Sequence, residues 1–143
     1  MKDVILDPED EHLRKFFNVY NGRLAAVRRR NGRTEYMHRV ITSAPTGMFV
    51  DHINGNPLDN RRSNLRVCTN AENLRNRGKT RANTSGYKGV WFNKIANFWY
   101  AALTVDGCVK NLGNYSTAEA AALAYNKAVK KYHGNFAKLN KVD

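Results

Sequence analysis

The sequence has 143 residues, a length that fits one ordinary domain or two small ones. Its 42% hydrophobic residues and only 3 prolines are typical of a folded chain and exclude a largely disordered one. Lysine and arginine outnumber aspartate and glutamate by 24 to 12, and the net charge of +12 indicates a polyanionic partner, of which nucleic acid is the most common.

No feature of the sequence indicates membrane attachment or secretion. No apolar run approaches the roughly 18 residues of a spanning helix, and the first dozen residues are acidic rather than basic. Cys68 and Cys108 form no CxxC pair, so we expect reduced thiols. We therefore expect a soluble, intracellular, cytoplasmic protein with no membrane partner. The acidic N-terminal cluster is expected to face solvent; it comprises Asp3, Asp7, Glu9, Asp10 and Glu11.

The first elements predicted in chain order are a short helix and three strands. The helix begins near Pro8 and ends within residues 13–17, and the strands follow at 17–20, 23–29 and 34–41. Asn21-Gly22 and Asn31-Gly32 separate the strands, and Asn-Gly favours a type I′ hairpin because both residues tolerate a positive φ. A three-stranded antiparallel meander is therefore predicted.

Residues 48–77 follow a different pattern. The short apolar segment 48–50 leads into a stretch of turn-forming residues, Asp51-His52-Ile53-Asn54-Gly55-Asn56-Pro57-Leu58-Asp59-Asn60. A brief strand is predicted at 65–68. Thr69 then begins a short helix that extends to Arg77, with Glu72 three residues later as in a capping box. The predicted order is strand, loop, strand and short helix.

Asp51 and His52 place a hard oxygen ligand beside an imidazole. Such a pair can hold a divalent ion and deprotonate a nearby water molecule, although the dipeptide alone is common by chance. Together with Asn64-Leu65-Arg66 and Asn73, however, residues 34–78 resemble the HNH endonucleases, in particular their homing-endonuclease branch.

The resemblance implies a ββα-metal fold with its core at residues 48–77, and a role for each matching residue. His52 would be the general base that activates water, and Asn64 would orient it. Asp51 and Asn73 would bind one Mg²⁺ ion. Because the last position is an asparagine rather than a histidine, Mg²⁺, Mn²⁺ or another hard divalent ion is favoured over zinc.

Three nearby residues are left outside this predicted site. Asn54 and Asn60 are interpreted as turn residues. His38 matches a histidine that is common in the same branch of the family, and either a structural or a catalytic role remains open for it.

Several basic residues are predicted to contact DNA phosphates. Those of the first domain flank the second Asn-Gly turn or lie between the predicted site residues, and they are Arg28, Arg29, Arg30, Arg61 and Arg62. Residues 79–84 contain no apolar residue larger than alanine and predict a linker after a nuclease domain at 1–78. Arg77, Lys79 and Arg81 add further positive charge there.

A second domain is predicted at residues 85–140, with strands at 87–93, 98–105 and 108–115 and an Asp106-Gly107 hairpin turn. Ser116 is the predicted N-cap of a helix that ends at Gly134. Its apolar face comprises Ala121, Tyr125, Ala128, Val129 and Tyr132. The whole chain is thus predicted to be α+β, with a three-stranded antiparallel sheet packed on one helix at its C-terminal end.

This second domain resembles the DNA-binding domain of plant ethylene-response transcription factors. The resemblance rests on Gly86-Tyr87-Lys88-Gly89-Val90-Trp91, Trp99-Tyr100-Ala101-Ala102-Leu103, Leu112-Gly113-Asn114-Tyr115 and Ala120-Ala121-Ala122-Leu123-Ala124-Tyr125-Asn126. It implies a sheet that enters the major groove.

Strand alternation predicts which side chains of this sheet face the helix and which face DNA. Val90, Ala101 and Leu103 should face the helix. The candidate DNA contacts are Lys88, Trp91, Asn93, Lys94, Tyr100, Ala102, Thr104 and Asn111. Because most DNA-facing arginines of that family are absent here, its base specificity is not transferred.

The sequence therefore predicts an HNH endonuclease of the homing type, encoded by a phage and acting on double-stranded DNA. One base and one metal ion predict a monomer that nicks a single strand. Two alternatives are a DNA-binding regulator without catalytic activity and an RNA-directed nuclease, because charge alone does not separate the two polymers. The target sequence and the biological role are left open.

Overall fold

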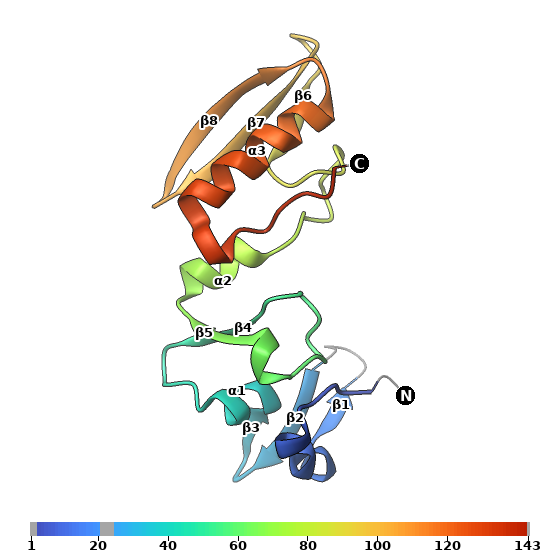
Figure 1. The fold of residues 1–143 in the computed structure, drawn as a ribbon, viewed down its shortest axis with the longest axis vertical. Helices are drawn as coiled ribbons and strands as arrows, with labels where there is room; N and C mark the ends of the chain where they lie inside the picture. Colours follow the sequence, from blue (N-terminus) through green and yellow to red (C-terminus); the bar gives the residue numbers. More distant parts are fainter. Residues whose placement is uncertain (1–2, 21–24, 143) are drawn as a thin grey trace. The chain divides into compact units, whose positions relative to one another are not determined.

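The structure is a computed structural model that describes residues 3–20 and 25–142. The chain folds into two compact units, Met1–Leu74 and Arg75–Asp143. Both units combine helices with antiparallel sheets, which confirms the predicted α+β class (Figure 1). No helix within the described residues is both long enough and apolar enough to cross a membrane.

The first unit begins with the 3₁₀ helix η1 (Pro8–Phe16) and a three-stranded sheet. The strands β1 (Asn18–Tyr20), β2 (Ala25–Arg30) and β3 (Arg33–Tyr36) pair antiparallel in chain order, so the predicted meander is confirmed. Asn31 and Gly32 have φ angles of 49° and 74°, the positive values that a type I′ turn requires. The predicted Asn21-Gly22 turn lies outside the described residues.

The predicted strand at 34–41 is wrong in its second half. β3 ends at Tyr36, and the helix α1 (Met37–Thr42) follows directly. Met37 and Ile41, four residues apart, are both buried in one cluster, and Val40 packs against it. This spacing of three and four residues suits a helix rather than a strand.

The next elements form a hairpin and a short helix. β4 (Phe49–His52) pairs antiparallel with β5 (Leu65–Cys68), which follows the 3₁₀ turn η2 (Arg62–Asn64). Helix α2 (Asn70–Asn76) comes next. Its capping box is confirmed, because the backbone N–H and the hydroxyl of Thr69 both donate to Glu72 Oε2 at 2.8 Å. The order is strand, strand and helix, as the sequence predicts.

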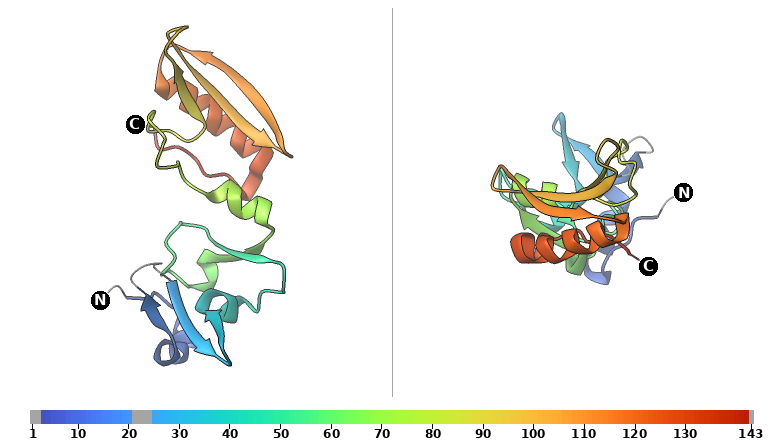
Figure 2. Two further views of the ribbon diagram at one scale, coloured as in Figure 1. Left: turned by 180° about the vertical axis from the view of Figure 1, so that it is seen from behind. Right: turned by 90° about the horizontal axis from the view of Figure 1, so that it is seen from above.

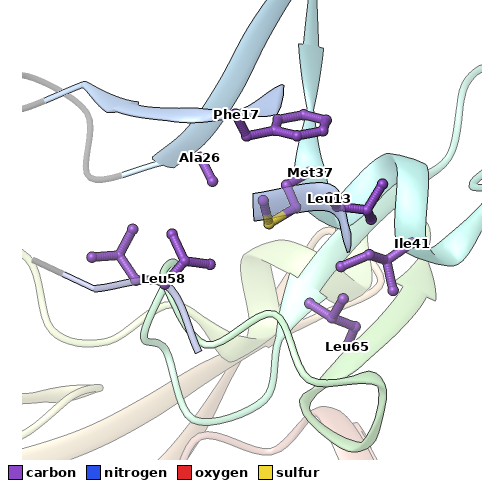
Figure 3. Packing of buried hydrophobic residues seen from close by; sticks show 8 residues of the cluster. Leu13, Phe17, Ala26, Met37, Ile41, Leu58 and Leu65 are labelled. Atoms are coloured by element: carbon purple, nitrogen blue, oxygen red, sulfur yellow. The ribbon is translucent and has the colours of Figure 1, made fainter. Parts of the chain in front are cut away.

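The core of the first unit holds the long loop between β4 and β5 in place. Figure 3 shows the cluster of apolar side chains from η1, β2, α1 and β5 to which Leu58 of this loop also belongs. The N-terminal segment also pairs with the loop, since Ile5 N–H donates to Leu58 O and Asn60 N–H donates to Ile5 O, both at 2.8 Å. The loop that follows His52 is therefore tied to the core by both packing and backbone hydrogen bonds.

The second unit is a sheet covered on one face by a helix. β6 (Val90–Asn93), β7 (Phe98–Val105) and β8 (Cys108–Tyr115) form an antiparallel meander, and α3 (Ala118–His133) lies along one face of it (Figure 2). β6 starts three residues later than predicted. Gly89 precedes it with a φ of +72°, and a Cβ at that position would collide with the ring of Tyr125.

Side chains on one face of this sheet form the second core with α3. Val90, Ala101 and Leu103 are buried against the helix, as the strand alternation predicts. Two details of the helix differ from the prediction. Its N-cap is Thr117, whose hydroxyl accepts from Ala120 N–H at 3.2 Å, rather than Ser116. Tyr132 is 38% exposed, with the ammonium groups of lysines over its ring, and so lies outside the apolar face.

Candidate active site

His52 is the last residue of β4 and has a fixed hydrogen-bond partner. Its Nε2 is 3.1 Å from Oδ1 of Asn60, whose side chain is almost fully buried in the loop. An amide oxygen only accepts, so Nε2 is the donor and the basic lone pair belongs to Nδ1. The sequence pattern places Asn60 among the turn residues and outside the site, whereas the structure brings it to the histidine ring.

His38, in the first turn of α1, packs against His52. The two ring centroids are 5.2 Å apart with the planes nearly perpendicular, and Tyr36 stacks with His38 at 5.4 Å. Burial, followed by the positive charges of His52 and Arg39, lowers the pKa of His38 to about 4. His38 is therefore neutral at neutral pH.

Asn64 is buried and its side chain holds the loop together. Its Oδ1 accepts from Asn54 N–H at 3.0 Å, and its Nδ2 donates to Asn54 Oδ1 at 3.1 Å and to Asp59 O at 2.7 Å. Its own carbonyl accepts from Ile53 N–H at 2.9 Å, next to His52. Asn64 thus fixes the backbone on either side of the loop, while the direct amide partner of the His52 ring is Asn60.

Asp51 is 6% exposed and pairs with a cation from the opposite strand. Arg66 donates to its Oδ2 through Nε at 2.8 Å and through Nη2 at 2.6 Å. Its charge also acts on Cys68, which pairs with Phe49 across the hairpin. Burial raises the pKa of this thiol most, and the charges of Asp51 and Glu72 raise it further. The Asp51 carboxylate is therefore buried and charge-compensated.

Asn73 lies within α2, half-buried, with its backbone N–H bonded to Thr69 O at 3.0 Å. Within the described residues, no hydrogen bond joins its side chain to Asp51. Among the same residues, no group of three or more histidine, cysteine or acidic side chains is arranged to hold a metal ion. A site built on one carboxylate and one amide does not need such a group.

The chemistry of this pair fits a hard divalent ion. Mg²⁺ is commonly held by one or two protein carboxylates, with water and substrate phosphates completing its shell. Asp51 and Asn73 would supply one carboxylate oxygen and one amide oxygen, and neither favours zinc. Arg66 is the cation that balances Asp51 in this structure.

Arg61 and Arg62, which the sequence assigns to DNA phosphates, are paired with buried carboxylates. Arg61 bonds Asp59 at 2.7 and 2.8 Å, and these hydrogen bonds are the largest cause of the lowered pKa of Asp59. Arg62 bonds Asp10 through two contacts of 2.8 Å. Asp10 is buried, so the expectation that the whole acidic cluster faces solvent is wrong for this residue. The Arg62–Asp10 pair joins the segment before β5 to η1, whereas the Arg61–Asp59 pair lies within the loop.

The other basic residues of the predicted DNA surface differ in how they are engaged. Arg28 bonds Glu35 at 2.6 Å, and Lys79 donates to Gly86 O at 3.1 Å. The remaining residues assigned there are exposed, and they are Arg29, Arg30, Arg77, Arg81 and Lys94.

The sheet face opposite α3 carries an aromatic pair. Trp91 and Tyr100 are directly opposite each other on β6 and β7 and stack at 5.3 Å, and Trp91 is 45% exposed. Thr104 is exposed on the same sheet, whereas Ala102 is buried, so its assignment to the DNA contacts is wrong. The side chain of Asn93 accepts hydrogen bonds from the N–H groups of Ile95 and Ala96, in the turn after β6. The side chain of Asn111 accepts one from Gly113 N–H, within β8.

The side chain of Lys88 forms hydrogen bonds away from this sheet face. Its ammonium donates to Arg75 O and Arg77 O, at 2.7 and 2.6 Å, near the C-terminal end of α2. Burial, followed by the charges of Lys138 and Arg77, lowers its pKa to about 8. A lysine bonded to the last carbonyls of a helix is a favourable arrangement. The ammonium group that the sequence assigns to DNA is therefore already bonded to backbone carbonyl groups in this structure.

His52 and the buried carboxylate of Asp51 lie on a unit of two strands and a helix, and this arrangement is the candidate site. A family model described as HNH endonuclease matches residues 35–75. The chain belongs to the HNH endonuclease family. Membership implies a nuclease, and hence a hydrolase; HNH nucleases bind DNA and typically use a divalent metal ion.

Two curated relatives are viral. Protein 3.8 of Escherichia phage T7 is 35% identical over 94 residues, which cover 66% of this chain and 77% of that protein. The uncharacterized HNH endonuclease L560 of Acanthamoeba polyphaga mimivirus is 37% identical over 100 residues, which cover 69% of this chain but only 50% of the relative. No solved structure matches the chain.

Proposed function

We propose that this chain is a metal-dependent DNA endonuclease of the homing type that nicks one strand of a duplex. Residues 1–78 would form the nuclease domain, 79–84 the linker and 85–140 a DNA-binding domain like that of ethylene-response factors. The observation that carries the proposal is the His52 ring, held by Asn60 in a single tautomer directly after the buried carboxylate of Asp51.

His52 acts as the general base. Its Nδ1 lone pair takes a proton from water, the water oxygen bonds to the phosphorus, and the bond between phosphorus and the 3′ oxygen breaks. The leaving oxygen takes a proton from solvent. Asn60 and Asn64 are positioning residues, one through the ring and the other through the loop backbone.

A divalent ion, Mg²⁺ or Mn²⁺, held by Asp51 and Asn73 would supply positive charge for the phosphate and the leaving oxygen. The hard oxygen donors and the burial of Asp51 support this assignment. Arg66 donates two hydrogen bonds to this carboxylate and fixes its orientation.

Binding of duplex DNA is assigned to exposed cations and to the open sheet face. Arg29 and Arg30, exposed at the end of β2, supply phosphate contacts, and Trp91 and Tyr100 offer an aromatic surface to a groove. One base and one metal site per chain favour a monomer that cuts one strand. The two viral relatives support a viral source for the chain.

The test is cleavage of supercoiled plasmid by His52→Ala with Mg²⁺ present. This variant loses at least about a hundredfold in rate because the general base is absent, while its affinity for DNA stays within about twofold. His12→Ala is the matched control, since His12 is an exposed histidine of the same unit that bonds Glu9 O. Cleavage by His52→Ala at the wild-type rate contradicts the mechanism. Linear plasmid that appears without a nicked intermediate contradicts single-strand nicking.

A further inference from the structure

Three aromatic rings, Tyr36, His38 and His52, form a continuous contact at the candidate active site. Tyr36 stacks on His38 with an interplanar angle of 28°, and His38 meets His52 at 84°. The sequence leaves the role of His38 open, and none of the family's implied roles falls on it.

We propose that His38 is a positioning residue that holds the imidazole of His52 in its reactive orientation by ring packing. The inference rests on the proposed function of His52. It adds a residue to the site that acts through the base and does not touch the substrate.

The need for such a residue follows from the geometry of His52. The hydrogen bond to Asn60 restrains the ring at Nε2, and such a bond by itself does not fix the tilt of an imidazole about the bonded atom. A second ring in perpendicular contact opposes the tilt. Perpendicular aromatic contacts are a favoured geometry and contribute modestly beyond the area they bury.

The support behind His38 is rigid. Met37, the preceding residue, is almost fully buried in the core, and Ile41 of the same helix is buried there as well. Tyr36 packs on His38 from the end of β3. His38 is therefore placed by the junction between β3 and α1, and its contact with His52 joins that junction to the end of β4.

The neutral state of His38 suits this role. When His52 accepts a proton it becomes a cation, and a second imidazolium in contact with it would oppose that charge. Burial favours the neutral ring at His38. The ring thus contributes shape without competing charge, and phenylalanine preserves these two properties.

The experiment compares His38→Ala, His38→Leu and His38→Phe in the full chain. At saturating DNA, the single-turnover cleavage rate falls about ten- to a hundredfold in His38→Ala and His38→Leu, because a displaced base loses its alignment with water. His38→Phe restores most of the rate. The dissociation constant for DNA, measured without metal, stays within about twofold in all three variants.

Nitrogen-15 spectra of the His52 ring give a readout that a merely structural role does not move. His38→Phe retains the wild-type signal with its proton on Nε2, whereas His38→Leu broadens or shifts it. Thermal unfolding shows which variants are folded, and His38→Leu, which keeps most of the volume, serves where His38→Ala does not fold.

Two controls separate the failure of this inference from that of the proposed function. Wild-type cleavage by His52→Ala shows that the proposed function is wrong. An inactive His52→Ala together with full activity of folded His38→Leu overturns only the role of His38. A rate loss in His38→Phe as large as in His38→Leu also overturns it, because packing alone then fails to support the base.

Discussion

The asparagines in and after the loop that follows His52 hold different groups. Asn54 and Asn64 bond each other and the backbone, so they close the loop upon itself. Asn60 bonds the ring of His52, and its amide nitrogen is buried without a hydrogen-bond partner among the described residues. Asn64 thus mainly stabilises the loop. Asn60 orients the histidine ring, and its buried, unpaired amide nitrogen makes this arrangement less stable.

This difference predicts opposite effects for two matched substitutions. Asn64→Ala leaves Asp59 O and Asn54 N–H without a partner and lowers the free energy of unfolding by about 2 kcal/mol. Asn60→Ala removes an unpaired buried amide and changes that free energy less, but it lowers the cleavage rate about tenfold or more by freeing the His52 ring. Urea denaturation and single-turnover cleavage measure the two effects. A folded Asn60→Ala with wild-type cleavage contradicts the assignment.

Asp51 and His52 can be identified from the sequence because a carboxylate next to an imidazole, followed by asparagines at set distances along the chain, is a recognisable pattern. It does not identify Asn60, since asparagine is common in turns and its partner depends on how the loop closes. The contacts of His38 are equally hidden, because they join residues fourteen positions apart on different elements. The spacing of residues in a sequence identifies the members of a known motif. The neighbours that support those residues depend on side-chain packing, which the sequence pattern does not show.

At the scale of elements, sequence patterns work best where local chemistry alone decides. Both described hairpin turns of the Asn-Gly or Asp-Gly type have two positive φ angles, and the Thr69 capping box forms as expected. The strand predicted through Met37 is wrong because burial of Met37 and Ile41 in one core outweighs the strand preference of the β-branched and aromatic residues beside them. Local propensity gives way to tertiary packing there.

The entry to β6 provides a test of packing between elements. Gly89 has a φ of +72°, and a Cβ there would collide with Tyr125 of α3 and approach Ala102 O to 2.8 Å. Gly86 has a φ of +82°, but nothing lies within 4 Å of the added atom. Gly86→Ala should therefore lose only about 1 kcal/mol of unfolding free energy, the cost of the backbone conformation.

Gly89→Ala should lose several times that amount, because it adds the collision to the same backbone cost. Denaturant unfolding followed by tryptophan fluorescence reports on this unit, since both tryptophans, Trp91 and Trp99, belong to its sheet. Equal losses in the two variants contradict the close approach of α3 to this turn.

For the molecule as a whole, the net charge of +12 gives the sign of the partner but not the location of the contact. Two adjacent pairs of arginines in the first unit differ in their partners. Arg61 and Arg62 are bonded to the buried carboxylates of Asp59 and Asp10. Arg29 and Arg30 are exposed on β2, and no ion pair involves them within the described residues. We therefore expect Arg29 and Arg30 to contribute more to phosphate binding, and Arg61 and Arg62 more to stability.

Two double substitutions that remove equal charge test this division. Arg29→Gln with Arg30→Gln weakens DNA binding and makes the slope of log K against log salt shallower by about 2, because each lost phosphate contact contributes about 0.9. Its unfolding free energy stays within about 0.5 kcal/mol of the wild-type value.

Arg61→Gln with Arg62→Gln leaves two buried carboxylates without their cations and lowers the unfolding free energy by at least about 2 kcal/mol. The salt slope changes little beyond the general loss of charge. Salt-dependent binding to a short duplex, combined with urea denaturation, measures both properties. If the Arg61 and Arg62 variant instead shows the shallower slope and full stability, these two arginines contact phosphate and their ion pairs contribute little to the fold.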